Sequence, residues 1–214
     1  MPLLEMIPFK SGDTLGIWHI SESADELTGL ITLSATEEDS LATLNHENRI
    51  TQWLATRCLL RRMVGPGHEI AYQPSGKPDL TNTEKYISVS HTSEYAAVML
   101  SHSPVGIDLE RRDRTVTPVV PRFLSTTEQK VLNNVNTPHP SSHLLAWCAK
   151  EALYKWDGAG SRTIDFKHDM EILDGPTSTG NVFPISLQTK GRKQVFQAHY
   201  VVRDHFVLVY IVNN

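Results

Sequence analysis

Three short segments between residues 86 and 110 constrain the fold more than any other feature of the sequence. Each is rich in β-branched, aromatic or aliphatic residues, and polar residues separate one from the next; they are YISVS (86–90), YAAVML (95–100) and VGIDLE (105–110). Runs of this length bounded by breaks are typical of β-strands, and residues 101–104 resemble the connection of a hairpin. The sequence therefore predicts a sheet in the middle of the chain.

Helix signals lie on both sides of these strands. Residues 36–64 open with Thr36 and Asp39 in a capping-box pattern and end at Gly65-Pro66-Gly67, a strong helix stop. Ser125, with a glutamate three residues later, predicts another helix start, and residues 142–156 form a helical pattern that ends at glycines. The chain therefore belongs to the α+β class.

The two halves of the chain, before and after about residue 103, have a similar content of elements. The first half adds a strand at 15–20 and a turn-rich loop, YQPSGKPDL, that presents Lys77; the second half ends in strand-like segments from 165 to 212. Each half is about the minimum size of a domain. We therefore predict a two-lobed α+β molecule.

The composition excludes several classes of function. Lys and Arg number 20 against 24 Asp and Glu, a net charge of −4, so no overall basic field favours nucleic acid. The longest aliphatic run, 206–212, is far shorter than the roughly 20 residues of a membrane-spanning helix. Cys58 and Cys148 are far apart, which argues against a disulfide framework and a structural zinc site. Since the N-terminus also lacks the charge order of a secretory signal, we expect a cytoplasmic protein without nucleic-acid or membrane partners.

Two carboxylates lie two residues apart on one predicted strand. Asp108 and Glu110 project from the same face of the pleat, where like charges repel unless a cation or several donors lie between them. A lone D-x-E is also typical of a solvated strand end. The pattern becomes informative only with other residues.

A second group lies on the helix predicted at 142–156. Trp147, Lys150, Glu151, Tyr154 and Lys155 follow one another at offsets 0, +3, +4, +7 and +8, which form one stripe on a helix. A core-facing stripe is apolar, whereas this one alternates aromatic with charged residues and resembles the wall of a site. An exposed helix with one i,i+4 ion pair is the simpler alternative.

A third group consists of donors suited to phosphate oxygens. Lys77 lies on its loop, Arg57 and Arg61 on the first long helix, and Ser90 with His91 at the end of the first predicted strand. Hydroxyl, imidazole and cationic side chains all serve as donors to phosphate. A histidine at a strand end has many structural roles, so only the combination is informative.

The motifs occur in an order that resembles a known family. Gly76-Lys77-Pro78 with Ser90-His91, then Gly106 to Glu110 (GIDLE), then Trp147 to Ala152 (WCAKEA) resemble the three signatures of the larger, Sfp-type 4'-phosphopantetheinyl transferases. The resemblance spans roughly residues 53–160, and three ordered motifs are far more specific than any one of them.

The resemblance implies a magnesium-dependent transfer. Phosphopantetheine would pass from coenzyme A to a serine of an apo acyl or peptidyl carrier protein, releasing adenosine 3',5'-bisphosphate. Asp108, Glu110 and Glu151 would bind Mg²⁺, which prefers carboxylate, phosphate and water oxygens. Asp108, Glu151 and Lys155 would be catalytic, with Lys155 stabilising the leaving phosphate and Lys150 assisting at coenzyme A. The base is either Glu151 or a metal-bound water.

The same resemblance assigns the coenzyme A contacts and the architecture. Lys77, Ser90, His91, Arg57 and Arg61 would contact the 3'-phosphate and pyrophosphate. The implied fold is a pseudo-dimer of two similar lobes in one chain, and the protein is expected to be a monomer. Residues 1–103 would form the coenzyme A lobe, and residues 104–214 the lobe of the metal carboxylates and the carrier protein, with the site between them.

Two other functions fit the same residues. D-x-E with a distant glutamate also suits another magnesium-dependent phosphotransfer enzyme, although the sequence has neither of the common glycine-rich nucleotide motifs. A non-catalytic module that binds coenzyme A or a carrier protein is the second alternative, although a pure binder has no need to concentrate carboxylates.

A run of arginines follows the two strand carboxylates. Arg111, Arg112 and Arg114, with Arg122 further along, form a candidate docking patch for an acidic carrier protein. These arginines could equally compensate the nearby acids, because exposed charges commonly contribute little.

Overall fold

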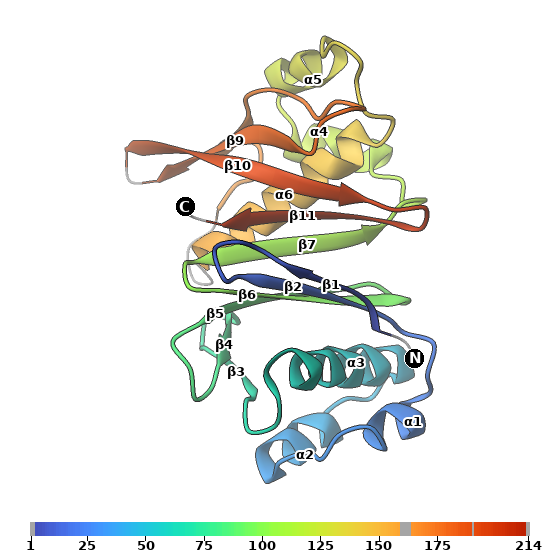
Figure 1. Cartoon of the computed structure of the whole chain (residues 1–214). Helices are drawn as coiled ribbons and strands as arrows, with labels where there is room; N and C mark the ends of the chain where they lie inside the picture. Colours follow the sequence, from blue (N-terminus) through green and yellow to red (C-terminus); the bar gives the residue numbers. More distant parts are fainter. Residues whose placement is uncertain (1–2, 159–163, 190, 213–214) are drawn as a thin grey trace. The chain divides into compact units, whose positions relative to one another are not determined.

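The computed structural model describes residues 3–158, 164–189 and 191–212. The chain divides into two compact units, Met1–Ser103 and Pro104–Asn214, and each has its own apolar core. Helices and antiparallel sheets occur in both units, which confirms the predicted α+β class (Figure 1).

The first unit is built on a four-stranded antiparallel sheet of order β1-β2-β6-β5. The helix α3 packs on β6 and β2, and α1 packs on α3. The hairpin β3-β4 forms a small sheet of its own beside β5. The elements are β1 (Leu3–Pro8), β2 (Thr14–His19), α1 (Ala24–Thr28), α2 (Ala35–Ala42), α3 (Glu47–Val64), β3 (Ile70–Tyr72), β4 (Pro78–Leu80), β5 (Tyr86–His91) and β6 (Tyr95–Ser101).

The second unit is built on a five-stranded antiparallel sheet of order β7-β11-β10-β9-β8. The long helix α6 lies across β7 and β11, as Figure 1 shows. The elements are β7 (Val105–Arg111), the 3₁₀ turn η1 (Thr117–Val119), α4 (Val120–Phe123), α5 (Thr126–Asn133), α6 (Ser142–Asp157), β8 (Met170–Ile172), β9 (Val182–Thr189), β10 (Arg192–Val202) and β11 (Phe206–Val212).

The apolar patterns of the sequence explain both cores. All seven residues of β6 are buried, and the aliphatic run at 206–212 is the mostly buried strand β11 between β7 and β10. Fully enclosed residues such as Leu59 in the first unit and Leu145 in the second complete the two cores. None of the helices formed by described residues has the length and apolarity to cross a membrane.

Three local predictions differ from the structure. The cap predicted at Thr36 lies two residues earlier, at Ser34, because Ser34 and Glu37 bond reciprocally between side chain and backbone. The loop at 72–80 contains the turn of the β3-β4 hairpin, where Gly76 has the positive φ of +84°. The strand β1 was not predicted, because it forms by pairing with β2 and its own residues have no clear strand pattern.

The packing of α6 on β7 depends on one glycine. A Cβ at Gly106 would overlap the backbone carbonyl of Ala152 and lie 2.6 Å from the backbone nitrogen of Trp156, both on α6. Neither atom belongs to a flexible side chain that could move aside. The helix therefore touches the strand backbone to backbone, and no larger residue fits at position 106.

We predict that Gly106→Ala destabilises the second unit by about 3 kcal/mol, the upper end of the usual cost of overpacking, because helix and strand must separate. Chemical denaturation followed by tryptophan fluorescence measures this change. Gly29→Ala is the matched control, since Gly29 has a helical φ of −66° and room for a methyl group. Equal stability of the two variants would contradict the close packing.

Candidate active site

The carboxylates of β7 lie on the face that α6 covers. Side chains two residues apart share a face of a strand, so Asp108 and Glu110 lie on the same side as Gly106. Position 106 touches the α6 backbone, which means that this side is the helix side. Asp108 is buried, whereas Glu110 is partly exposed where the strand nears its end.

Asp108 is held by two residues of α6. The ammonium of Lys155 donates to Asp108 Oδ1 at 2.8 Å and to the backbone carbonyl of Ile107 at 3.0 Å. Burial, followed by the charge of Asp108 and a hydrogen bond to it, raises the pKa of the Cys148 thiol well above its usual value. The structure thus brings Asp108 and Lys155 together. Cys148 is a neighbour that the sequence did not single out, because a lone buried cysteine has no sequence signal.

Glu151 lies on the same helix, one turn before Lys155. Burial raises the pKa of the Glu151 carboxyl, and the negative charge of Asp108 raises it further; the positive charges of Lys155 and Arg114 oppose the shift. Asp108, Glu151 and Lys155 are therefore close enough to affect one another electrostatically. Ionising Glu151 is therefore unfavourable unless a further cation compensates the carboxylate.

Glu110 has a partner of its own. Arg114 forms an ion pair with Glu110, and its guanidinium carbon lies 5.2 Å from the centre of the Trp147 ring. Arg114 was predicted as part of a docking patch and is also a neighbour of the carboxylates. The three carboxylates are thus accompanied by two cations, Lys155 and Arg114.

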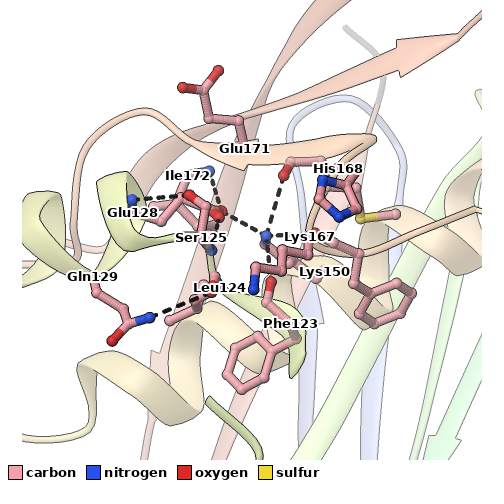
Figure 2. Close-up of polar contacts among 12 residues, drawn as sticks. Phe123, Leu124, Ser125, Glu128, Gln129, Lys150, Lys167, His168, Glu171 and Ile172 are labelled. Atoms are coloured by element: carbon pink, nitrogen blue, oxygen red, sulfur yellow. Dashed lines mark hydrogen bonds and ion pairs between the residues drawn. The ribbon is translucent and has the colours of Figure 1, made fainter. Parts of the chain in front are cut away.

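The charged stripe of α6 divides between two environments. Successive helix residues are rotated by about 100°, so Lys150 and Lys155 occupy opposite edges of the stripe. Lys155 lies beside β7, whereas Lys150 is 0% exposed. Figure 2 shows the Lys150 ammonium at the centre of a polar cluster. The ammonium contacts Glu128 at 2.5 Å and donates to three backbone carbonyls. These carbonyls belong to Phe123 (2.8 Å), Phe166 (2.6 Å) and Met170 (3.2 Å).

This burial corrects the prediction that Lys150 assists at coenzyme A. All of its donors are directed at acceptors inside the second unit, and none of its surface is exposed to reach a bound molecule. Glu128 is equally committed, since it accepts from Ser125 N at 2.7 Å and from Ile172 N at 3.0 Å. Burial lowers the pKa of Lys150, and Glu128 opposes that shift. The pair therefore links α5, α6 and β8.

We predict that Lys150→Met destabilises the protein by about 3–5 kcal/mol, because it leaves the Glu128 carboxylate buried without its cation. Lys193→Met is the matched control: the Lys193–Glu171 pair, with side chains 47% and 45% exposed, contributes about 0–1 kcal/mol. Urea denaturation measures both. Similar losses in the two variants would contradict the special role of the buried pair.

In the first unit, the two predicted arginines share one acidic partner. Arg61 contacts Glu37 at 2.7 Å and Arg57 contacts it at 3.5 Å, and Glu37 is itself the buried capping residue of α2. Arg57 also lies over the Trp53 ring, 3.2 Å from its centre. Burial lowers the pKa of Arg57 to about 10, against the opposing effects of Tyr72 and Glu37. These arginines therefore have structural partners already, which the sequence did not indicate.

Some of the predicted phosphate donors do meet. A cavity of about 100 Å³ in the first unit is lined by Arg49, Arg57 and His91, together with aromatic and apolar residues. His91 is exposed at the end of β5, whereas Ser90 is buried beside it. Lys77 is partly exposed in the β3-β4 hairpin and does not appear in the lining of this cavity. The structure thus brings Arg57 and His91 together.

The donor set of the second unit is chemically suited to magnesium. Asp108, Glu110 and Glu151 offer hard carboxylate oxygens from a strand and the helix that covers it, and the charge of Asp108 is felt at Glu151. As placed, however, no three acidic, histidine or cysteine side chains within the described ranges converge as a metal site. Asp108 and Glu110 contact Lys155 and Arg114 instead.

The raised pKa of Glu151 leads to a test of stability. The pKa of this carboxyl is higher in the folded protein than in the unfolded chain. The protonated carboxyl therefore favours the folded state, fully at a pH below the pKa of the unfolded chain. This contribution is lost as the pH rises through the pKa of the folded protein. Glutamine mimics the protonated acid. We therefore expect Glu151→Gln to raise Tm at pH 8 in EDTA by about 2 °C and to leave it unchanged near pH 4.5. Scanning fluorimetry across this range measures the effect; Glu84→Gln, at an exposed position, is the control. A lower Tm at pH 8 would contradict the assignment.

Comparison with known proteins gives the class to which the protein belongs. Residues 104–210, half of the chain, match the family model of the 4'-phosphopantetheinyl transferase superfamily, and the chain therefore belongs to that superfamily. Among curated proteins it is similar to the enterobactin synthase component D of Salmonella typhi and that of Salmonella typhimurium. Each is 33% identical over 70 residues, which are 32% of this chain and 30% of the relative. The match thus spans less than a third of those relatives.

Proposed function

We propose that the protein transfers the 4'-phosphopantetheine group of coenzyme A to a serine of an apo carrier protein, with adenosine 3',5'-bisphosphate as the second product. The observation that carries this proposal is the cluster of Asp108, Glu151 and Lys155 on β7 and α6, within the part of the chain that matches the superfamily. Carboxylates beside a lysine suit a transfer in which negative charge develops on phosphate oxygens.

The proposed step forms one bond and breaks another. The serine oxygen bonds to the phosphorus that carries pantetheine, and the bond from this phosphorus to the oxygen of the adenosine bisphosphate breaks. The serine proton passes to Glu151 or to a water molecule. The raised pKa of Glu151 makes it a better proton acceptor than an ordinary glutamate. Lys155, which donates to Asp108 at 2.8 Å, would stabilise the leaving phosphate in this proposal.

Asp108, Glu110 and Glu151 would hold the magnesium ion in this proposal. When bound, the ion would neutralise the pyrophosphate and compensate the carboxylates. The carboxylates would exchange part of their contacts with Lys155 and Arg114 for the ion.

The first unit would supply the coenzyme A contacts. Lys77, Ser90 and His91 are proposed as donors to its phosphates, and the cavity beside His91 adds the cation of Arg57. Arg61, paired at 2.7 Å with Glu37, is a weaker candidate for direct contact.

We also propose that the two units are halves of a pseudo-dimer. Three strands pair in the same order in each unit: β2-β6-β5 in the first and β7-β11-β10 in the second. The first strand of each series precedes the long helix, the second is the last strand of the unit, and the third is the last but one in the sequence. The long helices α3 and α6 pack on the first two strands of these series. A capping-box glutamate, Glu37 or Glu128, pairs with a cation of the long helix in each unit. This shared order supports a common ancestry of the halves.

The decisive experiment incubates the protein with coenzyme A, Mg²⁺ and a panel of apo carrier proteins. Mass spectrometry should show one carrier gaining a phosphopantetheine group. We predict that Asp108→Asn and Glu151→Gln lower turnover at least about 100-fold, because charge stabilisation and proton transfer are each worth that much.

Two further measurements separate the causes of a loss. Circular dichroism should show the fold of both variants intact, and Mg²⁺ should raise the Tm of the wild type more than that of Asp108→Asn if Asp108 binds the ion. Glu171→Gln, at a partly exposed position of β8, should keep normal turnover. Coenzyme A binding without any mass gain would contradict a transferase and indicate a binding module.

A further inference from the structure

A fixed turn after β7 presents Arg114. The Arg114 backbone nitrogen donates to the carbonyl of Arg111 at 3.0 Å, which closes a tight turn directly after the strand. Arg112 N donates to the His205 carbonyl at 2.9 Å and ties this turn to the connection between β10 and β11. The Arg111 guanidinium donates to the Asp113 carboxylate at 2.9 and 2.5 Å. Backbone and side-chain contacts therefore hold the segment that carries Arg114 in place.

The ion pair of Arg114 with Glu110 occupies one of the three proposed metal ligands. The arginine side chain is 40% exposed and the glutamate side chain 15%, so the carboxylate is the more enclosed partner. Burial and then the charge of Asp108 raise the pKa of the Glu151 carboxyl. The positive charges of Lys155 and Arg114 oppose this rise. One arginine thus acts on two of the three carboxylates.

A metal ion and Arg114 would compete for the same oxygens. Three ionised carboxylates beside Lys155 and Arg114 leave a net charge of −1, from −3 and +2, and a divalent ion would reverse its sign. Magnesium takes oxygen ligands at about 2.0–2.1 Å in near-octahedral geometry, so a guanidinium on the Glu110 carboxylate obstructs one of these positions. Binding of the ion to all three carboxylates therefore requires the ion pair to open.

Arg114 is better placed to leave its carboxylate than Lys155 is. The ammonium of Lys155 has a second anchor, since it donates to the Ile107 carbonyl at 3.0 Å as well as to Asp108. Arg114 is the more exposed of the two cations. Its guanidinium carbon lies 5.2 Å from the centre of the Trp147 ring, within the range of a cation–π contact. The ring therefore offers the guanidinium a partner when the carboxylate is withdrawn.

We propose that Arg114 is an internal competitor of the metal ion, which holds Glu110 before Mg²⁺ binds and releases it when the ion arrives. This inference rests on the magnesium site of the proposed function. The competition weakens binding of the ion alone. It thereby favours loading of the ion together with an anion that compensates the added charge, such as the pyrophosphate of coenzyme A.

The test measures the binding of Mn²⁺, an ion that carboxylate oxygens bind as they bind Mg²⁺ and that is quantified by electron paramagnetic resonance. The wild type, Arg114→Gln, Glu110→Gln and the double variant are titrated with Mn²⁺ alone. We expect Arg114→Gln to lower the Kd about fivefold, because an ion pair and a like charge are both removed. In the Glu110→Gln background, the same substitution should change the Kd less than about twofold, because the pair is already absent.

Arg192→Gln is the matched control, because it removes the same charge from an exposed position on β10 and should bind Mn²⁺ as the wild type does. Equal Kd values for the wild type and Arg114→Gln, or the same gain with and without Glu110, would overturn the inference. If Glu110→Gln weakens binding and Arg114→Gln leaves it unchanged, only this inference fails. If Glu110→Gln binds Mn²⁺ as tightly as the wild type, the magnesium site of the proposed function fails, and the inference fails with it.

Discussion

The direct contact between the backbones of α6 and β7 is the constraint on which the candidate site depends. Gly106 permits it, because any side chain there would collide with the carbonyl of Ala152. The same alternation that directs position 106 at the helix also directs Asp108 and Glu110 at it. A helix held further away would leave Lys155 unable to reach both the Ile107 carbonyl and Asp108. Gly106 and the carboxylates of the same strand motif therefore act together, because the glycine lets α6 come close enough for Lys155 to reach Asp108.

That geometry concentrates negative charge where the fold itself gains little from it. Burial raises the pKa of Glu151, the charge of Asp108 raises it further, and the positive charges of Lys155 and Arg114 oppose the shift. A strand and helix selected for stability alone would place apolar residues at these positions. Unfavourable charge that is kept next to a lysine is characteristic of sites where another charged group binds during function. The electrostatics of these residues thus indicate a functional site independently of the superfamily match.

Local patterns in the sequence predicted the elements that form local contacts. The strands at 86–110, the helix capped by Ser125 and the helix at 142–156 are all present, since alternation and caps act over a few residues. The strand Leu3–Pro8 was missed because its order depends on pairing with β2. The stripe on α6 was predicted as one wall of a site, but Lys150 enters the core. Its environment depends on Glu128, 22 residues away, and periodicity alone cannot reveal such a partner.

Lys150 and Glu151 are neighbours in the helix motif, but Lys150 lies in the core and Glu151 lies in the candidate site. Lys150 is fixed by three carbonyls and Glu128, which leaves α6 little freedom to rotate about its axis. Because successive residues differ by about 100°, fixing Lys150 also fixes the direction of Glu151 and of Lys155. The buried pair thus helps to orient the α6 residues of the candidate site. In the first unit, Glu37 anchors α3 through Arg57 and Arg61 in the same manner, so both long helices are oriented by a capping glutamate.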